Sequence, residues 1–212
     1  MGDGGEGAGR RGRFLVLDGI DGCGKSTQAR LLVAALHAPG RPLPLHLREP
    51  GSTAAGERIR TVLLDPRLTL GPAAEALLFV AARRQMLDEL VRPALLAGRD
   101  VVCERFHAAT YAYQGVAGGI DEAALLALLE EWAGDPAPDL TVVLDLDPAA
   151  AALRQGEARD RIEARGLAFQ RRVAAGFRRY GAARARVVLV DAAGTVDEVA
   201  ERVLAEVRRG GG

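Results

Sequence analysis

The sequence predicts an α/β fold, in which a five-stranded parallel sheet carries helices on both faces. Two observations support this fold class: five short apolar segments alternate with segments of helical periodicity, and no hairpin-type turn joins two strands. A chain of 212 residues with 49% hydrophobic content is long enough for one domain with a sizeable core. The first predicted strand begins at Phe14, and the others cover residues 43–47, 100–103, 140–146 and 186–190.

The first strand leads into a glycine-rich loop and then a helix. The loop matches the pattern G-x-x-x-x-G-K-[ST] at Gly19, Gly24, Lys25 and Ser26. Glycine lets the backbone approach a ligand closely, and the loop N–H groups together with the start of the helix favour bound phosphate. Lys25 would reach the β- and γ-phosphates, and Ser26 would bind Mg²⁺. An ordinary glycine turn before a capped helix is the alternative interpretation.

Lysine usage favours the phosphate site. The chain has 28 Lys and Arg residues, and Lys25 is the only lysine among them. A compact ammonium group and a planar guanidinium are not interchangeable in a tight backbone loop. The one position at which this arginine-rich sequence retains lysine is therefore the position at which a phosphate-binding loop requires it.

Charge and composition limit the other function classes. The formal net charge is zero and the pI is about 6.9, so we expect no nucleic-acid partner and no membrane partner. Cys23 and Cys103 suit reduced thiols, and the glycine-rich N-terminus has no apolar segment of a secretory signal. We therefore expect a cytoplasmic protein with a disordered tail at residues 1–12 and a single domain at residues 13–208.

The elements after the loop follow in order. The first helix ends before Pro39 and Gly40, and the second strand ends in a Pro-Gly turn. Carboxyl ends of parallel strands face the ligand crevice, so Glu104 and Arg105, which follow the third strand, belong to that region. Residues 155–165 are highly charged, which suits a solvated helix face or a mobile flap. Helices are predicted over residues 26–36, 57–64, 73–96, 121–132, 149–154, 167–180 and 196–207.

Several motifs together resemble those of the thymidylate kinase family, P-loop enzymes that phosphorylate dTMP. They occur in the order and spacing of that family, and the similarity runs from Phe14 to the last helix. The resemblance implies a P-loop kinase fold with a short lid, ATP as phosphoryl donor, Mg²⁺ as cofactor, dTMP as acceptor, and a homodimer. The matching segments are DGIDGCGKST at 18–27, REPGST at 48–53, LLFVAARRQ at 77–85, ERF at 104–106, AYQG at 112–115 and PDLTVVLDLDP at 138–148.

On the donor side, the resemblance implies that the glycine-rich loop and a later segment bind ATP. Asp21 resembles the loop acid that orients the acceptor or the metal, although it could instead make an Asx turn. Asp191 and Ala192 resemble the segment that borders adenine. The implied ATP-binding residues are Gly19, Ile20, Asp21, Gly22, Cys23, Gly24, Lys25, Ser26, Thr27, Asp191 and Ala192.

On the acceptor side, the resemblance assigns Arg105 to the dTMP phosphate, a role that suits its bidentate guanidinium. Phe79 would stack on thymine and Arg83 would bond its O4 atom, whereas periodicity alone favours an ordinary helix position for Phe79. Tyr113 would lie beneath the sugar and disfavour a 2′-hydroxyl, or serve as a core aromatic. The implied dTMP-binding residues are Glu49, Pro50, Phe79, Arg83, Arg105, Thr110, Tyr113 and Gln114.

The charged segment resembles the lid of the family, at about residues 150–165. The phosphate loop has Gly22 and Cys23 where some members carry a catalytic arginine, so a lid arginine would serve the transition state. Glu104 departs from the family, because aspartate is usual there, and the longer side chain could shift a water-mediated metal contact. The implied catalytic residues are Asp21, Lys25, Arg105, Arg154, Arg159 and Arg161, and the implied metal residues are Asp21, Ser26, Glu104 and Glu163.

Three other functions were weighed against this one. A GTP-dependent switch protein needs a second lysine in its guanine-recognition motif N-K-x-D, which the chain lacks, and the D-x-x-G match at 191–194 follows the final strand. A nucleotide-binding subunit with weak catalysis and a kinase for another nucleoside or nucleoside monophosphate both stay open. Turnover with a panel of monophosphates separates them.

Overall fold

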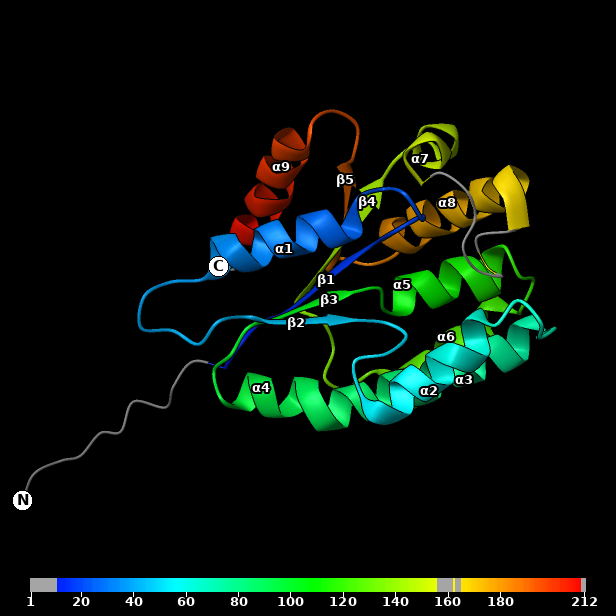
Figure 1. Cartoon of the computed structure of the whole chain (residues 1–212), viewed down its shortest axis with the longest axis horizontal. Coiled ribbons are helices and arrows are strands. Elements are labelled where there is room, and N and C mark those ends of the chain that lie inside the picture. The colour runs from blue at the N-terminus through cyan, green and yellow to red at the C-terminus, as the bar shows by residue number, and fades with distance from the viewer. Residues whose placement is uncertain (1–10, 156–161, 163–164, 211–212) are drawn as a thin grey trace, which may run out of the picture.

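The computed structural model describes residues 11–155, 162 and 165–210, and it confirms the predicted fold class (Figure 1). Five parallel strands form one sheet in the order β2-β3-β1-β4-β5. The central strand β1 is buried at every position, as expected of an apolar strand covered on both faces. The strands are β1 (Phe14–Gly19), β2 (Leu45–Arg48), β3 (Val101–Glu104), β4 (Leu140–Asp145) and β5 (Val187–Asp191).

Helices cover both faces of the sheet (Figure 1). α1 and α9 lie side by side on one face, and α3, α4 and α6 cover the other. The helical elements are α1 (Lys25–Leu36), α2 (Ala54–Leu64), α3 (Pro72–Met86), η1 (Leu87–Val91), α4 (Arg92–Leu96), α5 (His107–Thr110), η2 (Tyr111–Val116), α6 (Glu122–Ala133), α7 (Pro148–Gln155), α8 (Gly166–Ala182) and α9 (Val196–Arg209).

Alternation along β1 divides the core between two apolar clusters. Leu15 and Leu17 pack in a cluster with buried residues of α1, α8 and α9. Phe14 and Val16 point the opposite way and pack with residues of α3, α4 and α6. The sheet is therefore anchored on both faces, and its carboxyl edge is free to carry polar residues.

The predicted helix over residues 73–96 is helical throughout but is not one regular α-helix. Its middle, η1, is a π-helix that lies directly before the short helix α4. Pro93 in the first turn of α4 has no N–H, and its ring would clash with a carbonyl in a regular α-helix. The wider π turn lets the chain pass this point without ending the helix.

The last two residues of the predicted tail, Arg11 and Gly12, contact the folded part of the chain. The Gly12 N–H donates to the Leu95 carbonyl at 2.9 Å, and the Arg11 guanidinium pairs with Asp139 at 3.1 Å. These contacts fasten the chain to α4 and to the segment before β4. The remainder of the predicted tail, residues 1–10, lies outside the described residues. No described helix has the length and apolar content needed to cross a membrane.

Candidate active site

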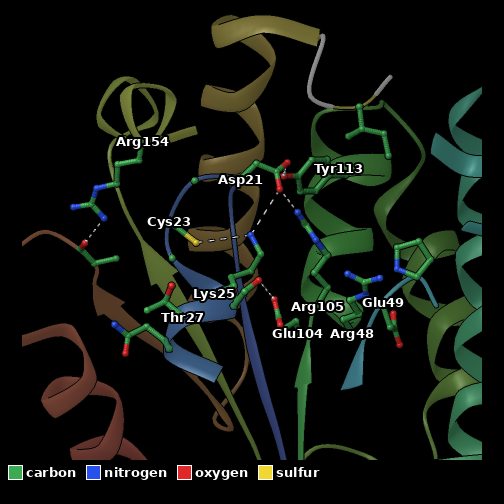
Figure 2. Close-up of a pocket in the computed structure, with 18 of the residues that line it drawn as sticks. Asp21, Cys23, Lys25, Thr27, Arg48, Glu49, Glu104, Arg105, Tyr113 and Arg154 are labelled. Atoms are coloured by element: carbon green, nitrogen blue, oxygen red, sulfur yellow. Dashed lines mark hydrogen bonds and ion pairs between the residues drawn. The ribbon is translucent and has the colours of Figure 1, made fainter. Parts of the chain in front are cut away.

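A cavity of about 740 Å³ opens at the carboxyl edge of the sheet, where ligand sites of α/β folds are found (Figure 2). One wall consists of the glycine-rich loop, the start of α1 and the segment after β5. The facing wall consists of residues from the ends of β2 and β3, from α2 and α3, and from α5 and η2. The polar and aromatic lining residues include Asp21, Lys25, Ser26, Thr27, Gln28, Arg48, Glu49, Arg60, Phe79, Arg83, Glu104, Arg105, Thr110, Tyr113, Gln114, Arg154 and Thr195.

The glycine-rich loop has the backbone conformation that its glycines predict. Gly22 has φ of 79°, and a Cβ there would lie 2.3 Å from the carbonyl oxygen of Ala151 in α7. Gly24, with φ of 99°, precedes the first residue of α1. Side chains at these positions would be strained or would clash, so the tight loop depends on glycine.

Lys25 is enclosed by this loop, with 8% of its surface exposed. Its ammonium donates to the carbonyls of Gly19 at 3.1 Å and Ile20 at 2.8 Å. The Cys23 sulfur lies 3.9 Å away, and burial raises the pKa of this thiol, which therefore stays neutral beside the ammonium. The structure thus places the one lysine of the chain at the centre of the loop (Figure 2).

Asp18, near the end of β1, is hydrogen-bonded to both walls of the cavity. Its carboxylate is fully buried and accepts from the N–H groups of Gly19 at 3.0 Å, Phe106 at 3.1 Å and Ala109 at 3.0 Å. Burial raises the pKa of Asp18, although Arg105 and Lys25 oppose that effect. Sequence analysis gave Asp18 no role, because only the fold shows that its partners come from two segments.

Arg105, Asp21 and Tyr113 form one polar group in the middle of the cavity (Figure 2). The Arg105 guanidinium donates to Asp21 and lies 5.4 Å from the centre of the Tyr113 ring, and the Tyr113 hydroxyl donates to Asp21 at 2.9 Å. Burial acts to raise the pKa of Asp21, but Arg105 and Lys25 outweigh it and lower the pKa to about 2. Asp21 is therefore ionised and holds Arg105 in place.

The backbone at Arg105 is also unusual for a non-glycine residue. Its φ is 68°, in the left-handed region, and its N–H donates to the carbonyl of Leu17 at 2.9 Å. Such conformations cost free energy and persist where surrounding contacts impose them, often at functional sites. The turn brings the guanidinium back over the cavity.

Arg83 is almost completely buried, with 1% of its surface exposed, and pairs with the equally buried Glu49. Its Nη2 donates to Glu49 at 2.6 Å and to the Thr110 hydroxyl at 3.0 Å. Its Nη1 has no hydrogen-bond partner among the described residues. Phe79 lies one turn earlier on α3 and lines the same cavity. Glu49, predicted to bind the acceptor, is thus engaged in positioning Arg83.

Glu104 lies at the end of β3 between the two walls. One carboxylate oxygen accepts from the Ser26 hydroxyl, and the other accepts from His46 Nε2 at 2.9 Å. Burial acts to raise the pKa of Glu104, but these two hydrogen bonds together with the charges of His46 and Lys25 outweigh it, and the pKa is lowered. His46 was missed by sequence analysis, because it lies on β2 outside any motif.

The segment after β5 closes the far end of the cavity. Ala192 is buried, and its carbonyl accepts from Arg154 of α7 at 3.2 Å (Figure 2). Asp191 does not line the cavity: its carboxylate instead accepts from the Ala193 N–H at 2.9 Å and shapes the turn. Thr195 and Val196, which sequence analysis did not select, line it in its place.

Thr27, Pro50 and Gln114 also line the cavity, whereas Gly19 and Ile20 do not. Of the four residues predicted for the lid, Arg154 lines the cavity, and the other three fall on positions outside the described residues, so the structure does not place them. These are Arg159, Arg161 and Glu163.

Comparison with known proteins identifies the family. The model of the thymidylate kinase family matches residues 17–203. The chain belongs to the thymidylate kinase family. A thymidylate kinase of Solidesulfovibrio magneticus is 43% identical over 90% of this chain and 96% of its own, and that of Deinococcus radiodurans is 40% identical over 95% and 98%. The crystal structure of thymidylate kinase from Ehrlichia chaffeensis superimposes with a TM-score of 0.77 at 28% identity, covering 93% of this chain and 99% of that one.

Membership of the thymidylate kinase family places the protein among the phosphotransferases that act on nucleoside monophosphates. The family match extends from β1 to α9 and therefore includes both walls of the cavity.

Proposed function

We propose that the protein transfers the γ-phosphoryl group of ATP to dTMP, giving dTDP and ADP. The observation that carries this proposal is the shared cavity, in which the phosphate loop with Lys25 faces a second wall with Arg105, Arg83 and Phe79. A phosphate loop alone suits any ATPase. A second wall with a partly buried cation, a fully buried cation and an aromatic ring suits a second nucleotide that carries its own phosphate.

Phosphoryl transfer depends on positioning and charge neutralisation more than on covalent chemistry. On the donor wall, the loop N–H groups and the start of α1 would hold the ATP phosphates. Lys25 would exchange its hydrogen bonds to the carbonyls of Gly19 and Ile20 for bonds to the β- and γ-phosphates, a short movement of one flexible side chain.

On the acceptor wall, each polar group has a matching part of dTMP. Arg105, held by Asp21, would bind the phosphate through its planar guanidinium. The unpaired Nη1 of Arg83 would donate to thymine O4 while the ring stacks on Phe79. Tyr113 would lie beneath the sugar and leave little room for a 2′-hydroxyl.

We propose Mg²⁺ as the cofactor, and the residues present fit it. The Ser26 hydroxyl and the Glu104 carboxylate are oxygen donors, the ligand type that Mg²⁺ prefers, and they lie against each other at the phosphate loop. Among the described residues, Asp21 is the other candidate ligand for Mg²⁺. When bound, the ion would neutralise negative charge on the phosphates of the nucleotide.

The lid and the assembly complete the proposal. We assign the transition-state arginine to the lid, and the hydrogen bond from Arg154 to the Ala192 carbonyl supports a position for Arg154 near the donor nucleoside. A homodimer and a cytoplasmic location also remain proposals. Leu77 of α3 and Trp132 of α6 are exposed on neighbouring helices, which suits a covered face in a dimer, and sedimentation analysis of the purified protein tests it.

Turnover with a panel of monophosphates tests the proposed reaction. We expect dTMP to be the best acceptor, and dUMP to be about 10- to 200-fold poorer in kcat/KM because it lacks one methyl group. Equal use of CMP or AMP would overturn the assignment to dTMP. Nucleotide binding without turnover would instead indicate a subunit with lost catalysis.

A further inference from the structure

A fully buried carboxylate, Glu75, lies behind the acceptor wall in the first turn of α3. One of its oxygens accepts from Gln114 Nε2 at 2.9 Å, and the other accepts from the Arg165 guanidinium at the start of α8. Arg165 is held in turn above the Phe169 ring, at 4.9 Å from its centre. Neither Glu75 nor Arg165 is among the residues that the sequence predicts for the site.

The chemistry of Glu75 fixes the orientation of the Gln114 amide. A carboxylate paired with a guanidinium can only accept hydrogen bonds, so Gln114 must turn its NH₂ group toward it. The carbonyl oxygen of Gln114 then points the other way. No described residue donates to that oxygen, and the Gln114 side chain lines the cavity. Gln114 therefore presents an acceptor, and not a donor, to a ligand.

The spacing on α3 places this acceptor beside the base. Glu75, Phe79 and Arg83 lie four residues apart in turn and share one face of the helix. A base stacked on Phe79 therefore lies between the Arg83 donor and the Gln114 acceptor. Thymine would offer its O4 atom to Arg83 and the neighbouring N3–H to Gln114. Cytosine would offer an amino group and an N3 acceptor in the same places.

We propose that Glu75 is a specificity-determining residue of this kinase. It holds the carbonyl of Gln114 toward the base, so that the site accepts the N3–H of thymine and rejects the bare N3 of cytosine. Glu75 touches no substrate and acts through Gln114. This inference rests on the proposed function, because it assumes that the acceptor wall binds a pyrimidine nucleotide.

Glu75→Gln tests the proposal with almost no change of shape. Arg165 can only donate, so it will take the amide oxygen of the new glutamine and leave its NH₂ group facing Gln114. Gln114 must then turn over and present a donor to the base. We expect the ratio of kcat/KM for dTMP to that for dCMP to fall by about 10- to 100-fold, from the loss of one buried hydrogen bond and its replacement by two opposed donors. The exposed Glu131→Gln serves as the matched control.

A second substitution separates orientation from general damage. In Glu75→Gln/Arg165→Leu the guanidinium no longer draws the amide oxygen away from Gln114, so the glutamine can offer that oxygen to Gln114 and the dTMP preference should return toward the wild-type ratio. Effects of Arg165 on turnover in general apply to both acceptors and cancel in that ratio. A ratio that stays low in the double variant would overturn the proposal, as would an unchanged ratio in Glu75→Gln.

Two further measurements keep the outcome clear. If Glu75→Gln does not fold, Gln114→Leu provides the test. Removal of the Gln114 acceptor should lower the ratio of kcat/KM for dTMP to that for dCMP, while the contribution of Arg83 remains. An unchanged ratio in Gln114→Leu overturns the proposal. Wild-type protein that phosphorylates no pyrimidine monophosphate contradicts the proposed function itself. Wild-type protein that prefers dTMP, with variants that keep the preference, contradicts only the role of Glu75.

Discussion

The ion pair between Arg105 and Asp21 crosses the active-site cavity from one wall to the other. Arg105 follows β3 on the acceptor wall, whereas Asp21 belongs to the phosphate loop on the donor wall. The Tyr113 hydroxyl donates to the same carboxylate and fixes its direction. The arginine proposed to bind the acceptor phosphate is therefore oriented by the loop proposed to bind ATP.

This pair should make the protein acid-sensitive in a defined pH window. The pKa of Asp21 is lowered from its ordinary value of 3.8 to about 2, so its stabilising effect is fully present above pH 4 and is lost as the pH falls toward 2. A shift of that size corresponds to about 2 kcal/mol of unfolding free energy. In urea denaturation at pH 5, the free energy of unfolding of wild type should exceed that of Asp21→Asn by about this amount. The difference between the two should shrink as the pH falls. A constant difference would contradict the assignment.

Replacement of Lys25 should abolish most activity without unfolding the protein. Lys25→Ala removes a charge that we expect to act on the transferring phosphates, which costs roughly 10²-fold or more in kcat when a transition-state donor is lost. Lys25→Arg should also be impaired, because the planar guanidinium does not fit the site in which Gly19 and Ile20 carbonyls receive the ammonium. Steady-state kinetics of both variants measures the loss, with circular dichroism as a folding control. Full turnover by Lys25→Arg would refute the need for a lysine at this position.

Two substitutions of Glu104 should show whether activity depends on the charge of this side chain or on its length. Glu104→Gln keeps the shape but loses the charge that His46 and Ser26 stabilise, and kcat should fall by about 10- to 100-fold if a charge-assisted hydrogen bond is lost. Glu104→Asp keeps the charge and should retain far more activity, although the shorter side chain cannot reach Ser26 and His46 together. A Mg²⁺ titration of both variants is the measurement. Equal kcat for Glu104→Gln and wild type would remove Glu104 from the site.

Removal of one partner from the buried pair of Arg83 and Glu49 should destabilise the protein strongly, because the other charge would stay buried without its partner. Glu49→Ala leaves the Arg83 charge buried without its carboxylate, and we expect a loss of about 3–5 kcal/mol in unfolding free energy. The double variant Glu49→Leu/Arg83→Met should lose less, because no unpaired charge remains. Arg178→Gln, at the exposed pair with Asp145, should change stability by less than about 1 kcal/mol. A double variant as unstable as Glu49→Ala would contradict this account.

Much of the fold could be predicted from local sequence signals. Every strand boundary that the sequence predicted lies within two residues of the observed one, because short apolar segments between helices have few alternatives in a parallel sheet. The π-helices were not predicted. η1 depends on how a helix accommodates Pro93, and η2 packs against α8, so neither follows from periodicity.

The site could be predicted only where residues belong to a motif. The loop around Lys25 and the residues Phe79, Arg83 and Arg105 lie in the cavity as expected. The partners that hold them were missed, because contacts such as His46 with Glu104 join strands far apart in the sequence. Asp191 was assigned to the adenine site through the family resemblance, whereas in the structure its carboxylate accepts from the Ala193 N–H and shapes the turn.

The shared attachment at Asp18 limits how this enzyme can be redesigned. One carboxylate receives N–H groups from the loop that follows it and from Phe106, which comes directly after the acceptor arginine, and Ala109 in α5. Together with the Arg105–Asp21 pair and the Ser26–Glu104 bond, this side chain of fixed reach holds the two walls at a set distance. An insertion or a grafted loop of another length on either side would detach one wall from it. Changes of acceptor preference must therefore come from side-chain replacement on a backbone of unaltered length.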